Sequence, residues 1–124
     1  MLAFTMPWPP SVNGYWRHPT TGKLAGRSLI SAKGRDYRDA IQRLATAESW
    51  GKVPDGARVS VQLDAWMPDK RRRDLDNILK AALDSLTHAG VWQDDSQIDH
   101  ISIRRVPMIG GMVKVRITTI DSAD

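Results

Sequence analysis

Nine residues in the middle of the chain, 59–67, alternate between apolar side chains and mostly polar ones. The apolar positions are Val59, Val61, Leu63, Ala65 and Met67. Because successive side chains of a β-strand point to opposite faces, this alternation predicts a strand with one face buried. Pro68 follows directly and would end the strand, since proline has no N–H for a sheet hydrogen bond. Other elements must therefore cover one face of a sheet.

Two segments carry the helical period and are the candidates for that cover. Ser31 is a suitable N-cap for a first helix that reaches about Ser49, although Gly34 lowers its helix propensity. A second helix is expected from about Asp74 or Leu75 to Ala89. Its apolar stripe consists of Leu75, Leu79, Ala82, Leu83 and Leu86, and Gly90 stands where a glycine commonly ends a helix.

The remaining strands are expected at the two ends of the chain. Leu2, Phe4 and Met6 alternate, as do the residues around Ile101 and from Val113 to Ile117. The last two runs are separated by a turn around Pro107 to Gly111 that contains Gly-Gly, which predicts a β-hairpin. Residues 11–28 are rich in Gly, Pro, Asn and Thr and are expected to form a loop that carries function. The predicted order β-α-β-α-β-β is an α+β fold over one domain, residues 1–124, with a mixed sheet and two main helices packed on it.

Composition excludes several classes of protein. The sequence holds no cysteine, which rules out disulfide frameworks and thiolate chemistry. It shows neither the roughly 18 consecutive apolar residues of a membrane span nor the basic start of a signal peptide, so a cytoplasmic protein is expected. The formal net charge is +4, and Arg provides twelve of the 18 cations while Asp provides thirteen of the 14 acids. Basic surfaces favour polyanions and clustered aspartates favour divalent metal, so we expect chemistry on nucleic acid.

The acidic residues gather next to a run of cations. Lys70, Arg71, Arg72 and Arg73 lead directly into Asp74-Leu75-Asp76 at the predicted helix start. Lys80 lies four residues after Asp76, on the same helix face, and Asp94-Asp95 follow the end of the helix. Two or three carboxylates suffice for Mg²⁺, which prefers oxygen ligands and keeps some of its waters.

This pattern is typical of phosphodiester hydrolysis. A bound metal polarises the phosphoryl oxygen and generates hydroxide, and a nearby lysine stabilises the developing charge or protonates the leaving oxygen. The cations at residues 70–73 would hold flanking phosphates. Each piece alone has a simpler interpretation, because Asp is a common helix cap and Asp-Lys pairs four apart are common on solvated helices. Their co-occurrence within one small domain favours the catalytic interpretation.

The same residues resemble a known family, the RusA family of Holliday junction resolvases. The resemblance rests on the following positions: Pro7-Trp8-Pro9-Pro10-Ser11, Tyr15-Trp16-Arg17, Arg71 to Asn77, Lys80-Ala81-Ala82, Asp84, Leu86, Gly90, Trp92 and Asp94-Asp95. It implies a homodimeric, Mg²⁺-dependent endonuclease that cuts four-way DNA junctions by paired symmetrical hydrolysis in recombination and repair, with Mn²⁺ as a substitute metal.

The resemblance also implies roles for individual residues. By position, the essential carboxylates would be Asp74, Asp76 and Asp95, with Lys80 as the supporting cation. Asp94 is the alternative metal ligand to Asp95, and the sequence does not separate the two.

Aromatic and basic side chains in the N-terminal loop suggest a DNA contact. Tyr15, Trp16 and Arg17 lie in an otherwise polar segment, and aromatic rings there can stack on bases. Trp66, on the polar phase of its strand, is a candidate dimer contact.

Two other functions remain open at this point. A non-catalytic basic DNA-binding module would use its aspartates only as caps and surface charge. A metal enzyme acting on small phosphates would need a Gly-rich phosphate loop, which the sequence lacks.

Overall fold

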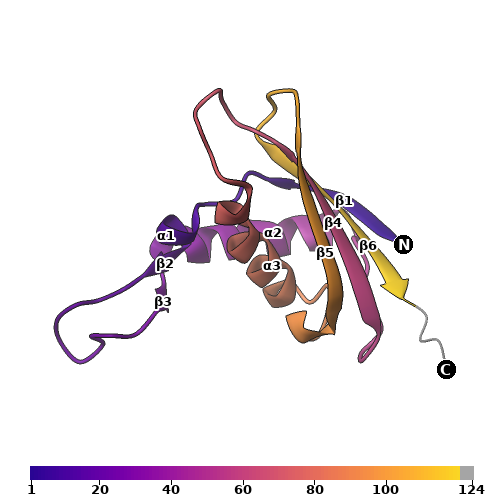
Figure 1. Ribbon diagram of the computed structural model, residues 1–124. Coiled ribbons are helices and arrows are strands. Elements are labelled where there is room, and N and C mark those ends of the chain that lie inside the picture. Colours follow the sequence, from indigo (N-terminus) through magenta and orange to yellow (C-terminus); the bar gives the residue numbers. More distant parts are fainter. Residues whose placement is uncertain (121–124) are drawn as a thin grey trace.

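The computed structural model describes residues 1–120 as a sheet covered on one side by helices (Figure 1). In chain order, the elements are β1 Leu2–Pro7, α1 Val12–Tyr15, β2 Trp16–Arg17, β3 Leu29–Ile30, α2 Ala32–Ala47, β4 Arg58–Trp66, the 3-10 turn η1 Leu75–Ile78, α3 Leu79–His88, the 3-10 turn η2 Asp95–Gln97, β5 Ile98–Val106 and β6 Met112–Ile120. The α+β class, the mixed sheet and the two main helices are confirmed.

The predicted hairpin between the last two strands is wrong. The main sheet has the order β1-β6-β4-β5, so β4 lies between β5 and β6. β5 runs parallel to β4, and β6 is antiparallel to both β4 and β1. β6 carries three buried apolar side chains, Val113, Val115 and Ile117. The place between β4 and β1 buries them in the core, whereas β5 at the edge leaves Ile101 exposed.

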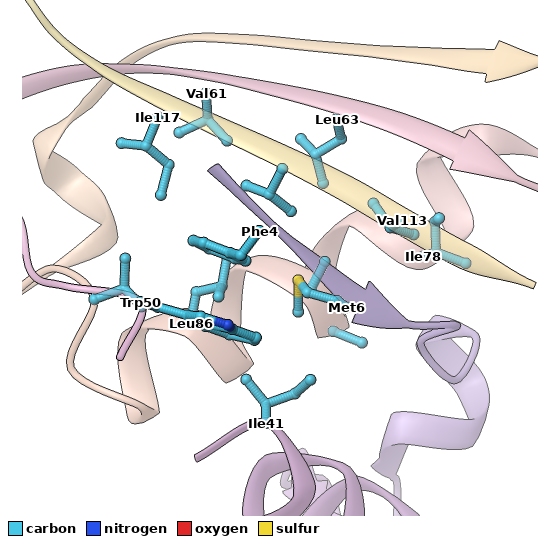
Figure 2. Packing of buried hydrophobic residues seen from close by; sticks show 14 of the residues in the cluster. Phe4, Met6, Ile41, Trp50, Val61, Leu63, Ile78, Leu86, Val113 and Ile117 are labelled. Atoms are coloured by element: carbon cyan, nitrogen blue, oxygen red, sulfur yellow. The ribbon is translucent and has the colours of Figure 1, made fainter. Parts of the chain in front are cut away.

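The core lies between the sheet and the helices. Figure 2 shows side chains from β1, β4 and β6 meeting Ile41 of α2 and Leu86 of α3. The ring of Phe4 stacks on Trp50 with ring centres 4.0 Å apart. Burial of such apolar surface is the main favourable term in folding. It fixes the two helices on one face of the sheet.

The two helix starts differ. Ser31 caps α2 as expected, and its hydroxyl accepts a hydrogen bond from the backbone N–H of Gly34 at 2.9 Å. The predicted second helix begins instead as the 3-10 turn η1 and becomes α-helical at Leu79. Asp74 stands at the N-cap position of η1 in an extended conformation, without a capping bond from its side chain. The start of this helix therefore leaves the Asp74 carboxylate free of a capping role.

The expected N-terminal loop is more ordered than predicted. A short helix, α1, is followed by β2 and β3, which pair as a two-stranded ribbon. We call residues 16–30 the arm. In Figure 1 the arm extends away from the sheet and from α2 and α3. Its position gives the chain a projecting element beside the helical face.

Candidate active site

A pocket of about 400 Å³ opens between the arm, the start of α3 and η2. Its lining consists of Trp16, Asp76, Leu79, Lys80, Leu83, Asp84 and Asp95. The residues come from three separate parts of the chain, so only the folded protein assembles them. Three carboxylates and one lysine on a partly apolar wall are a donor set suited to a divalent cation and a phosphate.

Three of these side chains are regularly spaced along the chain. Asp76 lies in η1, Lys80 is four residues later and Asp84 four residues later again. Residues four apart share one face of an α-helix, so Lys80 and Asp84 are aligned on α3, and Asp76, in the preceding 3-10 turn, lines the same pocket. Among residues 1–120, neither Asp76 nor Lys80 forms an ion pair. Both charges are therefore available to a ligand.

The structure distinguishes the two neighbouring aspartates that the sequence could not separate. Asp94 is the N-cap of η2, and its carboxylate accepts a hydrogen bond from the N–H of Ser96 at 3.1 Å. That bond holds the pKa of Asp94 below its usual range. Asp95 lines the pocket, and burial, followed by the hydrogen bond it shares with Asp94, raises its pKa. Asp95 is thus the member of the pair that faces the site.

Asp84 is a pocket residue that the sequence reasoning did not select for a role. Its Oδ2 accepts a hydrogen bond from the Tyr15 hydroxyl and bonds from Arg38, with Nε at 2.8 Å and a terminal nitrogen at 2.7 Å. The Lys80–Asp84 spacing was a signal for it, because residues four apart share a helix face. Arg38, on α2, had no such signal, since 46 residues separate it from Asp84.

Asp74 is not brought into this pocket. It precedes η1 and is exposed, while Asp76, Asp84 and Asp95 form the acidic lining. Within residues 1–120, no three carboxylate or imidazole groups are close enough together to form a ready-made metal site. The oxygen donors still fit Mg²⁺, because this ion keeps several waters and is commonly bound through one or two carboxylates.

The cationic run forms a surface loop next to the site. Arg73 is partly engaged, since its guanidinium bonds Asp69 at 2.8 Å. Arg105 of β5 donates to the backbone carbonyl of Arg73 and holds the loop against the sheet. Lys70 and Arg71 line a second depression together with Arg105. This side of the molecule therefore concentrates positive charge within a few residues of η1.

The three N-terminal residues proposed from sequence as DNA contacts, Tyr15, Trp16 and Arg17, fall into different environments. Tyr15 is fully buried, and burial together with its bond to Asp84 raises its pKa to about 12, so the hydroxyl keeps its proton. Trp16 is half-buried and lines both the acidic pocket and a neighbouring one that shares Lys80. Arg17 is exposed. Tyr15 thus has an internal role, and only Trp16 and Arg17 border space that a ligand can enter.

The described helices are too short or too polar to cross a lipid bilayer.

Comparison with known proteins gives consistent matches over nearly the whole chain. The family model described as "Endodeoxyribonuclease RusA" matches residues 7–118. A "Crossover junction endodeoxyribonuclease RusA" from Shigella sonnei (strain Ss046) is 41% identical over 117 residues, 94% of this chain and 92% of the relative. The protein of that name from Escherichia coli (strain K12) is 40% identical over 117 residues, with the same coverage. The one from Enterobacteria phage HK97 is 42% identical over 120 residues, 96% of this chain and 95% of the relative.

Proposed function

This chain belongs to the RusA family of endodeoxyribonucleases, and from that premise we propose how it acts as a crossover junction endodeoxyribonuclease that resolves four-way DNA junctions. The observation that carries the proposal is the pocket in which Asp76, Lys80 and Asp95 meet. Phosphodiester hydrolysis needs charge stabilisation and an activated water, and this set of side chains can support both.

We propose Mg²⁺ as the metal, with Mn²⁺ as a substitute. Asp76 and Asp95 would hold it. Asp74, outside the pocket lining at the N-cap of η1, is a third candidate ligand on the family resemblance alone, and Asp94 is less favoured because it caps η2. A metal held there would supply charge stabilisation at the phosphoryl oxygen and would lower the pKa of a water molecule that attacks the phosphorus. Asp76 and Asp95 would be its protein ligands, and the apolar side chains of Leu79 and Leu83 would limit the water that reaches the same space.

Lys80 is the proposed cationic partner of the carboxylates. It forms no ion pair within the described chain, so its ammonium group is free to contact a phosphate oxygen. There it stabilises the charge that builds up during hydrolysis, or donates a proton to the leaving oxygen.

DNA binding is assigned to the surfaces that flank the pocket. Lys70, Arg71 and Arg72 are exposed, and with Arg73 they would contact backbone phosphates, which position a duplex without reading its sequence. Arg17 and Trp16 would contact the strand on the arm side. Selectivity for a junction then comes from the shape of the combined surface.

Paired symmetrical cutting requires two active sites. We propose a homodimer whose two-fold symmetry matches that of the junction, so that each protomer cuts one strand. The proposed compartment is the cytoplasm, in agreement with a DNA substrate and a chain that lacks cysteine.

One assay tests the proposal. A labelled four-way junction, and a linear duplex with the sequence of one of its branches, are each incubated with the protein in Mg²⁺ or in chelator. We expect paired nicks in the junction only when Mg²⁺ is present. Salt-sensitive junction binding without any cleavage in Mg²⁺ or Mn²⁺ would instead support a non-catalytic DNA-binding module.

A further inference from the structure

The root of the arm is held by hydrogen bonds from three helices. Tyr15, the last residue before the arm, is fully buried, and its hydroxyl donates a hydrogen bond to the carboxylate of Asp84 on α3. Arg38 of α2 bonds both partners, with Nε 2.9 Å from the Tyr15 hydroxyl and 2.8 Å from Oδ2 of Asp84. Three elements, α1, α2 and α3, are thereby joined at one point. We call these three residues the clamp.

The other end of the arm is tied to the same point. Ser31, directly after β3, donates its backbone N–H to the carbonyl of Tyr15 at 2.9 Å, and its hydroxyl donates to the carbonyl of Gly14 at 2.6 Å. Gly34 of α2 lies so close that a Cβ there would be 2.5 Å from the carbonyl oxygen of Tyr15. This explains the glycine that weakens the helix propensity of α2: the backbone of the arm root occupies the space of its side chain.

Beyond its root the arm forms no hydrogen bond or ion pair with the rest of the described chain. The hydrogen bonds of residues 18–28 in the described chain stay inside the arm, between His18 and Ser28, Pro19 and Gly26, Gly22 and Ala25, and Leu24 and Arg27. Its tip residues are exposed. The direction in which the arm points is therefore set at the root.

The clamp also forms part of the active-site wall. All of its bonds to Asp84 go to Oδ2, and Asp84 lines the pocket one helical turn after Lys80. On the arm side, Trp16 follows Tyr15 in the chain and lines the same pocket. One carboxylate thus connects the catalytic face of α3 to the element that borders the DNA path.

We propose that Tyr15, Arg38 and Asp84 are positioning residues that hold the arm at a fixed angle to the catalytic pocket, so that junction DNA lying on the arm presents its phosphodiester bond to Lys80, Asp76 and Asp95. The proposal rests on the nuclease function given above. It assigns Asp84 to the clamp, acting through Tyr15 and Arg38, and not to the reacting atoms.

The chain offers a direct way to measure the arm angle, because it has no cysteine. Cysteines introduced at two exposed sites, Thr21→Cys in the arm and Thr118→Cys on β6, take spin labels without background. We expect a narrow distribution of distances between the labels in the unmodified chain and a clearly broader one in Tyr15→Phe. Arg38→Gln, at a partly exposed side chain, provides a second test that does not depend on the buried ring.

The matched control removes an ion pair elsewhere. Asp99→Asn breaks the exposed pair between Arg58 and Asp99, which joins β4 to β5 and touches neither arm nor pocket. It should leave the distance distribution unchanged. An unchanged distribution in both clamp variants would overturn the proposal.

Cleavage by the unlabelled variants tests the functional half. We expect the single-turnover rate of junction cleavage to fall on the order of 10-fold in Tyr15→Phe, because a displacement of the substrate by about 1 Å can reduce a rate by more than that. The thermal unfolding temperature should stay close to that of the unmodified chain. A broadened arm with an unchanged rate would overturn the positioning role. If the unmodified chain cuts no junction, the proposed function fails, while the distance measurement still decides whether the clamp fixes the arm.

Discussion

Two acidic regions of this molecule use the same residue type in opposite ways. On the open face of the sheet, Asp64 is 2% exposed and bonded by Arg104 at 2.7 Å and by Arg116 at 3.0 Å. In the pocket, Asp76 and Asp95 have no ion-pair partner within the described chain. The charge of Asp64 is balanced by arginines of the neighbouring strands, whereas Asp76 and Asp95 have no such partner among the described residues and their carboxylates are open to a ligand.

The pKa directions follow this division. The hydrogen bond from Arg104 holds the pKa of Asp64 below its usual range, because it favours the ionised form. Burial and the neighbouring Asp94 raise the pKa of Asp95. At neutral pH, the ionised carboxylate of Asp64 therefore stabilises the folded protein, whereas that of Asp95 destabilises it. Groups that are unsatisfied in this way are typical of functional sites.

The largest expected effect tests the pocket side of this comparison. Asp76→Asn should lower junction cleavage on the order of 100-fold or more, because the loss of a metal-binding charge removes several kcal/mol of transition-state stabilisation. Junction binding should persist, since the change reduces negative charge near DNA. Cleavage rates and a gel-shift titration measure the two properties. Full cleavage by this variant in Mg²⁺ would contradict the assignment of Asp76.

The next effect concerns the sheet side. Asp64→Asn should lower the free energy of unfolding by roughly 1–3 kcal/mol; this is less than a fully buried pair would lose, since both arginines remain largely exposed. Cleavage by the folded protein should be unchanged. Chemical denaturation at neutral pH measures the loss.

The pH dependence of the Asp64 variant gives an independent check. Because the folded pKa of Asp64 lies below its unfolded value of 3.8, its stabilising contribution is present above that value. The contribution disappears as the pH falls through the folded pKa. The difference between Asp64→Asn and the unmodified chain should therefore shrink only in strong acid, and a difference that vanishes already near neutral pH would contradict this interpretation.

A smaller effect distinguishes free from engaged arginines. Arg72→Gln should weaken DNA binding a few-fold and reduce the slope of log K against log salt by about 1, as expected for the loss of one phosphate contact. Arg116→Gln is the matched control, because Arg116 is bound to Asp64 on the open face. Equal slopes for the two variants would mean that the basic loop is not the phosphate-binding surface.

The smallest expected effect is a change in the free energy of unfolding when Asp95, the pocket carboxylate with the raised pKa, is replaced. Asp95→Asn should raise the free energy of unfolding at neutral pH, by less than about 0.5 kcal/mol, because the ionised carboxylate is less favourable in the folded protein than in the unfolded chain. The gain should vanish as the pH falls through the raised pKa, where the unmodified carboxyl is itself protonated. A stability loss at neutral pH would show that Asp95 supports the fold.

The sequence by itself determined the elements that have a local cause. Alternation placed β4, Ser31 placed the start of α2, and Gly90, with φ of 81°, ended the second helix as expected. It also predicted that Asp76 and Lys80 lie on the same side of the second helix; both line one pocket, although Asp76 stands in the 3-10 turn before α3. The family resemblance was visible in the sequence because it rests on residue types at matching positions along the chain, from Pro7 to Asp95, and not on contacts between them.

The tertiary structure alone decided the pairings between distant segments. The sequence pattern was compatible with a hairpin of β5 and β6, but burial of the apolar face of β6 in the core placed β4 between them. Likewise, nothing local relates Tyr15 and Arg38 to Asp84, and nothing local separates Asp95 in the pocket from Asp94 in its cap. These contacts join residues that only the packing of helices on the sheet brings together, so their physical cause lies in the fold as a whole.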